Sequence, residues 1–321
     1  MKVLVVKLSS LGDVVHAMPA VQDMRQALPD LQIDWVAESG FAPLVARCEG
    51  VQRVIESDIR SWRKSPLSPV TRRRFRAFRQ QLQAERYDAV IDLQGLTKSA
   101  FVSWLARVAG GGKRFALGNQ TEGAGYENPT RWVADVAIRL EPHVHAVERS
   151  RQLCARALGY EVPAGTRYGL SALAVPRQPA VVALAHGTSR ADKLWPEPHW
   201  IELGHRLMQS GYGLALPHGN DEEEARSQRL AREFGKAATV WPRLALDDLA
   251  RQLGHMAGVI GVDSGLSHIA VALDLPHVQI YNFDTAWRTG PVGSPHQVSV
   301  YAQPAPGIDS VWAAWREVAA A

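Results

Sequence analysis

Short apolar runs alternate along the chain with longer stretches in which apolar residues recur every three or four positions. The short runs predict buried strands, and the periodic stretches predict amphipathic helices. The strands expected from these runs are 2–7, 32–36, 53–55, 89–92, 114–117, 181–185, 213–216, 258–262 and 277–281. Strands that alternate with helices predict mainly parallel sheets covered by helices on both faces, which is the α/β class.

One strand-to-helix turn is especially clear. The strand 258–262 passes through Asp263, Ser264 and Gly265 into a helix that carries His268 one turn further on. The first turn of a helix has unpaired N–H groups, and here they would lie at the carboxyl end of a parallel sheet, which suits an anion. Taken alone, however, the turn favours a capped helix with a solvated histidine.

The chain is long enough for two domains of about 150 residues each. The segment 159–179, rich in Pro, Gly and Ala, indicates an interdomain connection. We therefore expect an N-terminal α/β domain over 1–165 and a C-terminal one over 166–305. An amphipathic helix over 306–321 is expected to pack back toward the N-terminal domain. The segment from Gly110 to Lys113 predicts a turn, and Pro19 predicts a kink in the first helix or its firmer start.

The sequence shows no signal for export or membrane insertion. No apolar run approaches the roughly 18 residues that span a bilayer, and no signal peptide precedes the first strand, so the chain is expected in the cytoplasm. The two cysteines, Cys48 and Cys154, belong to no CxxC pair. Isolated thiols suit a reducing compartment better than a disulfide framework or a zinc site.

Positive charge is concentrated in one segment. Residues 60–86 contain nine bases and one acid, a charge of +8, so the rest of this +4 chain carries −4. A cluster of this density indicates a polyanionic partner such as nucleic acid, an acidic membrane surface or a phosphorylated substrate. A solvated helix face is the alternative.

Several common site types are missing from the sequence. It contains no GxGxxG dinucleotide fingerprint and no GxxxxGK phosphate loop. The segment 261–265 is not a nucleophile elbow, because its serine stands one position late. There is no D-x-D pair, so an enzyme that acts on a sugar nucleotide would need protein donors instead of a metal on the diphosphate.

The segment 186–196 supplies such donors after a predicted buried strand. Thr188 and Ser189 offer hydroxyls, Gly187 gives the backbone freedom, and Lys193 adds a cation. These groups can stabilise a leaving diphosphate without a metal. For either hydroxyl alone, helix capping is an equally good explanation.

Four segments together carry a resemblance that none of them carries alone. They are, in order, KLSSLGDVVH at 7–16, HAVER at 145–149, HGTSRADKLWP at 186–196 and DSGLSH at 263–268. The set resembles glycosyltransferase family nine, the bacterial lipopolysaccharide heptosyltransferases, over nearly the whole chain, and the third segment favours the type I enzymes. The resemblance implies a GT-B fold, with two Rossmann-like domains facing across a cleft, and a metal-independent enzyme without a cofactor.

The implied reaction transfers L-glycero-D-manno-heptose, with inversion, from ADP-heptose to the first Kdo of Kdo2-lipid A in lipopolysaccharide inner-core biosynthesis. The expected partners are therefore ADP-heptose, Kdo2-lipid A and, peripherally, the cytoplasmic face of the inner membrane. The protein is expected to be a monomer and to bind no nucleic acid.

The family pattern also implies site residues. Its donor-binding positions match Thr188, Ser189, Lys193, Glu223, Asp263, Ser264, Gly265 and His268. Acceptor binding is implied for Ser9, Ser10, Gly12, Arg60, Arg63 and Lys64. The register at Glu223 is open by one residue, because successive glutamates at a helix start also suit the helix dipole.

Asp13 matches the catalytic base of the family, and Lys193 would stabilise the departing ADP. An acceptor hydroxyl must lose a proton as it attacks the anomeric carbon, and an unpaired carboxylate on a loop suits that role. A cap of the first helix is the alternative for Asp13.

Two features near these sites allow more than one interpretation: the aromatic residues of the basic segment and the loop 282–288. Trp62, Phe75 and Phe78 interleave with the bases of 60–86, as in a surface that meets lipid headgroups, although core packing is the usual fate of such aromatics. The loop 282–288 departs from the family pattern, in which Gly and Pro follow the strand. If it closes over the donor, sugar or base preference would differ.

Three other functions remain open. Heptosyltransferase II would act on an already heptosylated core. A sugar-nucleotide epimerase of the same fold also has a DSG turn, but the double glycine and following acid of those enzymes are missing here. A nucleic-acid-binding protein would use the basic segment and leave the motifs at Asp13, Lys193 and Asp263 unexplained.

Overall fold

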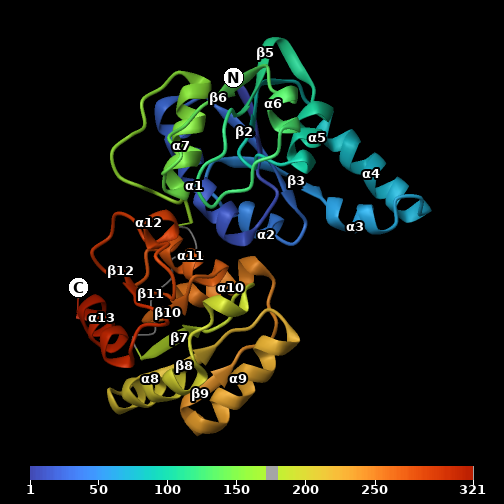
Figure 1. Cartoon of the computed structure of the whole chain (residues 1–321). Coiled ribbons are helices and arrows are strands. Elements are labelled where there is room, and N and C mark those ends of the chain that lie inside the picture. Colours follow the sequence, from blue (N-terminus) through green and yellow to red (C-terminus); the bar gives the residue numbers. More distant parts are fainter. Residues whose placement is uncertain (171–179, 321) are drawn as a thin grey trace. The chain divides into compact units, whose positions relative to one another are not determined.

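The computed structural model describes residues 1–170 and 180–320, and it divides into two compact units, Met1–Gly169 and Leu170–Ala321 (Figure 1). The predicted connection 159–179 lies at this division, and its residues 171–179 are outside the described residues. Strands and helices alternate in both units, as the hydrophobic pattern predicts.

The first unit is a parallel sheet with helices on both faces. Its strands are β1 (Lys2–Val6), β2 (Gln32–Glu38), β3 (Val51–Ser57), β4 (Tyr87–Asp92), β5 (Val108–Leu117) and β6 (Val136–Ile138). Its helices are α1 (Leu11–Ala27), α2 (Ala42–Val45), α3 (Ile59–Lys64), α4 (Pro69–Leu82), α5 (Thr97–Leu105), α6 (Pro129–Val133) and α7 (Ala146–Leu158). Helices α3, α4 and α5 bury apolar side chains against one face, and α1 packs against α7 on the other (Figure 1).

The second unit repeats this plan. Its strands are β7 (Val181–Ala185), β8 (Gly213–Leu216), β9 (Ala238–Val240), β10 (Gly258–Val262), β11 (His277–Tyr281) and β12 (Gln297–Tyr301). Its helices are α8 (Glu197–Gln209), α9 (Asp221–Phe234), α10 (Leu246–Gly254), α11 (Gly265–Ala272), α12 (Ala286–Thr289) and α13 (Ile308–Ala320), with short 3-10 turns η2 (Ala191–Lys193) and η3 (Gly235–Ala237).

The two sheets have the same strand order. It is β3-β2-β1-β4-β5-β6 in the first sheet. In the second it is β9-β8-β7-β10-β11-β12, which is the same order when the strands are counted from β7. All these neighbours pair in parallel. This is the doubly wound Rossmann order, in which the direction of winding reverses between β1 and β4 and between β7 and β10. Ligands of such sheets bind outside the carboxyl ends of the strands at these two switch points.

The C-terminal helix corrects one expectation. Val311, Trp315 and Val318 of α13 are buried in the core of the second unit, together with Val278 and Ile280 of β11. The apolar face of this helix therefore belongs to the core of its own unit, not to a contact with the first. The physical reason is that β11 and β12 present an apolar face, and α13 follows β12 closely enough to cover it.

Three other differences concern an irregular strand, the start of the first helix and strands that the pattern missed. The glycine-rich segment 110–113 lies inside β5, where the pairing register with β4 shifts, and Gly111 takes a positive φ of 85°. The segment forms an irregularity in a strand instead of a turn. Pro19 lies inside α1, which begins at Leu11, so it does not mark the start of that helix. The sequence pattern also missed β6, β9 and β12, which are short or carry few apolar residues.

Candidate active site

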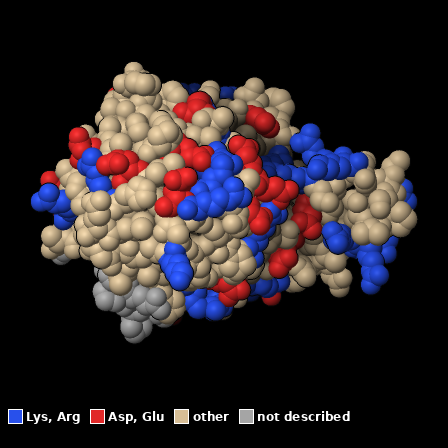
Figure 2. Space-filling model, turned by 90° about the horizontal axis from the view of Figure 1, so that it is seen from below, with Lys and Arg blue, Asp and Glu red and all other residues tan. Residues whose placement is uncertain are grey.

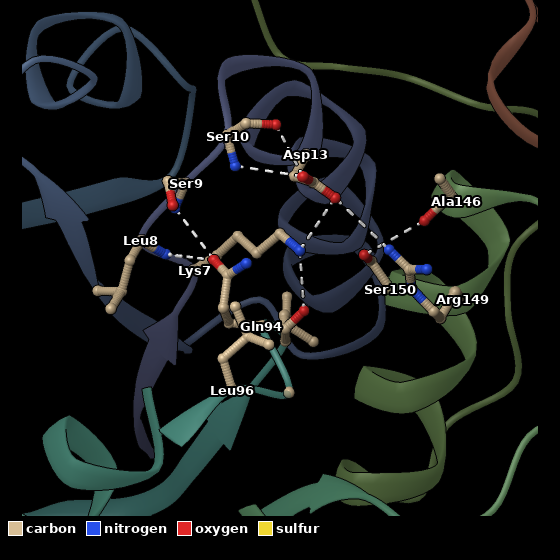
Figure 3. A network of polar contacts seen from close by, with 12 residues as sticks. Lys7, Leu8, Ser9, Ser10, Asp13, Gln94, Leu96, Ala146, Arg149 and Ser150 are labelled. Atoms are coloured by element: carbon tan, nitrogen blue, oxygen red, sulfur yellow. Dashed lines mark hydrogen bonds and ion pairs between the residues drawn. The ribbon is translucent and has the colours of Figure 1, made fainter. Parts of the chain in front are cut away.

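Asp13 lies in the first turn of α1, just beyond the carboxyl end of β1 (Figure 3). Its Oδ2 accepts hydrogen bonds from the backbone N–H and the hydroxyl of Ser10, at 3.2 and 2.9 Å. Its Oδ1 is 3.4 Å from Nζ of Lys7 and 3.7 Å from Nη2 of Arg149. The carboxylate therefore caps α1 and is ion-paired at the same time.

These neighbours keep Asp13 ionised. Burial by itself would raise the pKa of Asp13, but the positive charges of Lys7 and Arg149 and the hydrogen bond from Ser10 hold that pKa well below its usual range. Burial lowers the pKa of Lys7, and Arg149 lowers it further, while Asp13 opposes both. The expectation of an unpaired carboxylate on a loop is thus wrong: Asp13 is helical and paired with two cations.

Gln94, which follows β4, holds the loop that leads into α1. Its Oε1 accepts hydrogen bonds from the backbone N–H groups of Leu8 and Ser9, both at 3.0 Å (Figure 3). The two strands of the switch point therefore fix this loop jointly. Lys7, Gln94 and Arg149 were not among the predicted site residues, although Lys7 and Arg149 belong to the segments that carry the family resemblance.

Ser9 and Arg60, two of the predicted acceptor-binding residues, lie together. Ser9 Oγ accepts hydrogen bonds from Nη2 of Arg60 at 3.2 Å and from Nζ of Lys98 at 2.6 Å. Glu38 pairs with both cations, each at 3.2 Å. Glu38 and Lys98 stand in no recognisable motif, so the sequence carried no signal for them.

The remaining predicted acceptor residues are more spread out. Ser10 bonds to Asp13 as described, and Gly12 lies in the first turn of α1. Arg63 and Lys64 are exposed on α3, and no described hydrogen bond joins them to the Ser9 group.

The aromatic residues of the basic segment are mainly part of the core. Trp62 and Phe78 are buried, Phe75 packs against their cluster, and the Trp62 ring lies 5.6 and 5.3 Å from the rings of Phe75 and Phe78. These aromatic residues therefore pack in the core, which is the alternative to a membrane surface given above. The bases remain outside, and Figure 2 shows Lys and Arg side chains gathered over the projecting α3–α4 region at its right.

Asp263 occupies the switch point of the second sheet, between β10 and α11. Its Oδ2 accepts a hydrogen bond from Nζ of Lys193 at 2.5 Å, and its Oδ1 lies 3.4 Å from Nε2 of His268. The hydroxyl of Thr188 donates to its main-chain oxygen at 3.1 Å, and the amide of Gln279 donates to Oδ1 at 3.4 Å. Four of the predicted donor-binding residues therefore form one connected group.

The charge of Asp263 is also fixed. Burial would raise its pKa, but the hydrogen bond with His268 and the charge of Lys193 hold the pKa of Asp263 well below its usual range. Ser264 is the N-cap of α11 and Gly265 its first residue, so the unpaired N–H groups of that helix start beside this ion pair. Within the part of the chain that the structure describes, the buried hydroxyl of Ser264 has no hydrogen-bond partner.

Glu223 lies in the first turn of α9. Its Oε2 accepts a hydrogen bond from the N–H of Gly219 at 2.7 Å. A Cβ added at Gly187 would come within 2.4 Å of the Glu223 carboxyl carbon, so this side chain packs closely on the loop after β7. Glu222 instead is largely exposed and pairs with Arg226 at 3.6 Å. Ser189, also predicted to bind the donor, is exposed.

Two features are absent from the described residues, 1–170 and 180–320: a metal-binding cluster and a membrane-spanning helix. No three His, Cys, Asp or Glu side chains are grouped there as they would be around a metal ion. None of the helices in that part of the chain combines the length and apolar composition needed to cross a membrane.

Comparison with known proteins identifies the family. The family model described as glycosyltransferase family 9 (heptosyltransferase) matches residues 75–308. The chain belongs to glycosyltransferase family 9. It is 41% identical over 291 residues to lipopolysaccharide heptosyltransferase 1 of Escherichia coli K12, which covers 88% of both chains. Lipopolysaccharide heptosyltransferase 2 of that strain is 24% identical over 297 residues, 88% of this chain and 82% of its own.

Solved structures of this family agree. The E. coli heptosyltransferase WaaC with ADP has a TM-score of 0.89 at 36% identity, over 99% of this chain and 100% of its own. The same enzyme with ADP-2-deoxy-2-fluoro heptose has a TM-score of 0.81 at 37% identity, over 99% and 98%. The family 9 chain is therefore a heptosyltransferase of lipopolysaccharide biosynthesis with a GT-B fold, which confirms the fold and family predicted from its sequence, and the type I enzymes are the better match.

Proposed function

We propose that this family 9 enzyme is a type I lipopolysaccharide heptosyltransferase, which transfers L-glycero-D-manno-heptose from ADP-heptose to the first Kdo of Kdo2-lipid A with inversion. The observation that carries the proposal is the 41% identity to a type 1 enzyme, against 24% to a type 2 enzyme of the same organism. The ADP in the solved E. coli relative supports the nucleotide half of the donor.

The donor would bind at the switch point of the second sheet. Lys193 presents an ammonium group beside the start of α11, where Ser264 and Gly265 bring unpaired N–H groups. A cation and a helix N-terminus both favour a diphosphate, and they favour it most as negative charge develops on departing ADP. Thr188, Ser189 and His268 would complete this site, and Glu223, packed on Gly187, would accept hydrogen bonds from the ribose.

Asp13 would act as the base on the acceptor hydroxyl. Its depressed pKa keeps the carboxylate ionised at neutral pH, but it also makes Asp13 a weak base. The attacking oxygen becomes strongly acidic once its bond to the anomeric carbon begins to form, so we expect proton transfer to follow late in a single in-line displacement. Ser9, Ser10, Gly12 and the bases of α3, which include Arg60, would hold the acidic acceptor nearby.

The α3–α5 region supports peripheral contact with an anionic membrane. Four large apolar side chains are exposed there: Leu67 (75%), Val70 (60%), Phe101 (41%) and Trp104 (61%). Phe101 stacks between Phe75 of α4 and Trp104, with ring centroids 6.2 and 6.1 Å apart. Apolar side chains beside a dense cluster of Arg and Lys suit an interface with acidic headgroups, where the cytoplasmic leaflet would present the lipid acceptor.

The decisive experiment supplies purified protein with ADP-heptose and Kdo2-lipid A, follows ADP release, and confirms heptosylated lipid A by mass. The proposal predicts a product heavier by one heptose and no ADP release without acceptor. Donor consumed only with an already heptosylated acceptor would indicate the type II reaction instead. If neither acceptor supports turnover, the proposed transfer reaction is rejected and an epimerase reaction on this fold becomes the alternative.

A further inference from the structure

Asn282 follows β11 directly and binds the turn that carries Lys193. Its side-chain amide donates to the main-chain oxygens of Asp192 at 3.1 Å and of Leu194 at 2.9 Å, the residues on either side of Lys193. The side chain is nine-tenths buried. A reversed amide would set Oδ1 against two carbonyl oxygens, so the hydrogen bonds fix the orientation of the amide.

The turn needs such a support. Residues 189–192 are exposed, and η2 is a single 3-10 turn, which supplies few hydrogen bonds of its own. Beyond the turn the chain is anchored by Trp195, which is buried and whose indole N–H donates to the main-chain oxygen of Pro306 at 2.8 Å. Asn282 thus ties down the exposed turn between the end of β7 and this anchor.

The arrangement follows from the sheet. Strands β7, β10 and β11 are neighbours, and their carboxyl ends lead into the Lys193 turn, Asp263 and Asn282, respectively. Lys193 is therefore fixed at two points. Its ammonium group is held by Asp263 at 2.5 Å, and its backbone is held on both sides by the Asn282 amide.

We propose that Asn282 is a positioning residue for the donor site, which holds the backbone around Lys193 so that the ammonium group faces the diphosphate of the sugar nucleotide. The proposal rests on the donor role of Lys193 stated above. It assigns a function to the first residue of the 282–288 loop, and it explains why a polar amide is buried at the end of a strand whose other residues are packed in the core.

A double-mutant cycle with ADP as the probe tests this. Asn282→Ala is expected to raise the Kd for ADP about tenfold in the parent, because the lysine is no longer held in register. In a Lys193→Ala background the same substitution should change the Kd less than twofold. Asn282→Ser retains one donor and should give an intermediate effect, which provides a second variant if the alanine protein folds poorly.

Asn119 offers a matched control in the first unit. Its amide likewise donates to two main-chain oxygens, of Gln120 at 2.9 Å and Leu140 at 3.0 Å. Asn119→Ala should lower the thermal unfolding midpoint but leave the Kd for ADP unchanged. If Asn119→Ala weakens ADP binding as much, or if the Asn282 effect is equal in both backgrounds, Asn282 is only a structural residue and the inference is overturned.

The same data separate this inference from the proposed function. If Lys193→Ala itself leaves ADP affinity unchanged, the donor role of Lys193 is wrong and the positioning role falls with it. If Lys193→Ala weakens ADP binding and Asn282→Ala does not, only the inference about Asn282 is rejected.

Discussion

Both switch points carry an Asp–Lys pair, but the accessible member is reversed. In the first unit the side chain of Asp13 is 36% exposed and that of Lys7 only 2%. In the second unit Asp263 is 6% exposed and Lys193 is 20% exposed. The same pair of residue types, at the switch point of each sheet, thus exposes a carboxylate in one unit and an ammonium group in the other.

With the roles proposed above, this reversal would let one fold serve both halves of a transfer reaction. Lys7 is a buried counter-ion that keeps an accessible carboxylate ionised, which a proton acceptor requires. Asp263 is a buried counter-ion that holds an accessible ammonium group, which a departing diphosphate requires. Variants of the four residues should therefore separate into effects on turnover and effects on donor affinity.

The largest effect is expected from Asp13→Asn. The amide keeps the shape of the side chain and an oxygen for the Ser10 N–H, but it cannot accept a proton. We expect turnover to fall by about 10² to 10⁴, the usual value of a general base, while the Kd for ADP stays within about twofold. Steady-state ADP release and calorimetric ADP binding would measure the two. Turnover near that of the parent would reject Asp13 as the base.

Lys193→Ala should produce the opposite pattern. Loss of a charge-assisted hydrogen bond to the diphosphate is expected to raise the Kd for ADP-heptose about 10- to 100-fold, with a smaller effect on the acceptor. Arg60→Ala is the matched loss of a cation in the first unit and should change the acceptor KM instead. Equal donor affinity in the Lys193 variant and the parent would remove the distinction drawn between the two pairs.

The sequence singled out Asp13 and Asp263, but it did not show which member of each Asp–Lys pair is exposed. Periodicity gives the parallel strands, and strand ends in a doubly wound sheet meet at one edge, so Asp263 was expected at the carboxyl end of a sheet, whereas Asp13 was singled out by its match to the family pattern. Exposure depends on what packs above each group. Lys7 is covered because β1 is central and Arg149 approaches from α7, contacts between residues far apart in the chain that no local pattern encodes.

The same limit applies to the misplaced elements. The pattern of α13 shows that one face is buried, but periodicity does not say against which unit, and the helix covers β11 and β12. The spacing of Trp62, Phe75 and Phe78 favoured a core face without excluding a membrane face, and only the fold shows that they pack in the apolar cluster beneath α3 and α4.

Lys7→Met should sharpen the role of the buried lysine. The substitution keeps an unbranched apolar stem and removes a charge that lowers the pKa of Asp13, so that pKa should rise toward its usual range. Activity that needs ionised Asp13 would then decline at a higher pH than in the parent as the solution is acidified. The pH dependence of kcat/KM measures the shift, and Lys193→Met provides a control in which this acidic limb should stay in place. If the acidic limb of the kcat/KM profile lies at the same pH in Lys7→Met and in the parent, Lys7 does not lower the pKa of Asp13.

The smallest expected effect is on the pH dependence of stability, which should have opposite sign for a buried group in each unit. Burial lowers the pKa of His277 to about 4 and raises that of Asp92 to about 6. Between pH 6 and 4 the unfolded chain binds a proton at His277 that the folded chain does not, so acid destabilises; at Asp92 the folded chain holds the extra proton, so acid stabilises.

Relative to the parent, His277→Asn should therefore gain, and Asp92→Asn should lose, about 1 kcal/mol of stability per pH unit of acidification in this window. Asparagine at 277 can still donate to the main-chain oxygen of Val259, which His277 Nδ1 contacts at 2.8 Å, so the constant cost of substitution is limited. Denaturant midpoints measured from pH 6 to 4 would show the two slopes. Curves parallel to that of the parent would mean that neither group keeps its shifted pKa, and that burial in the two cores does not act with opposite sign.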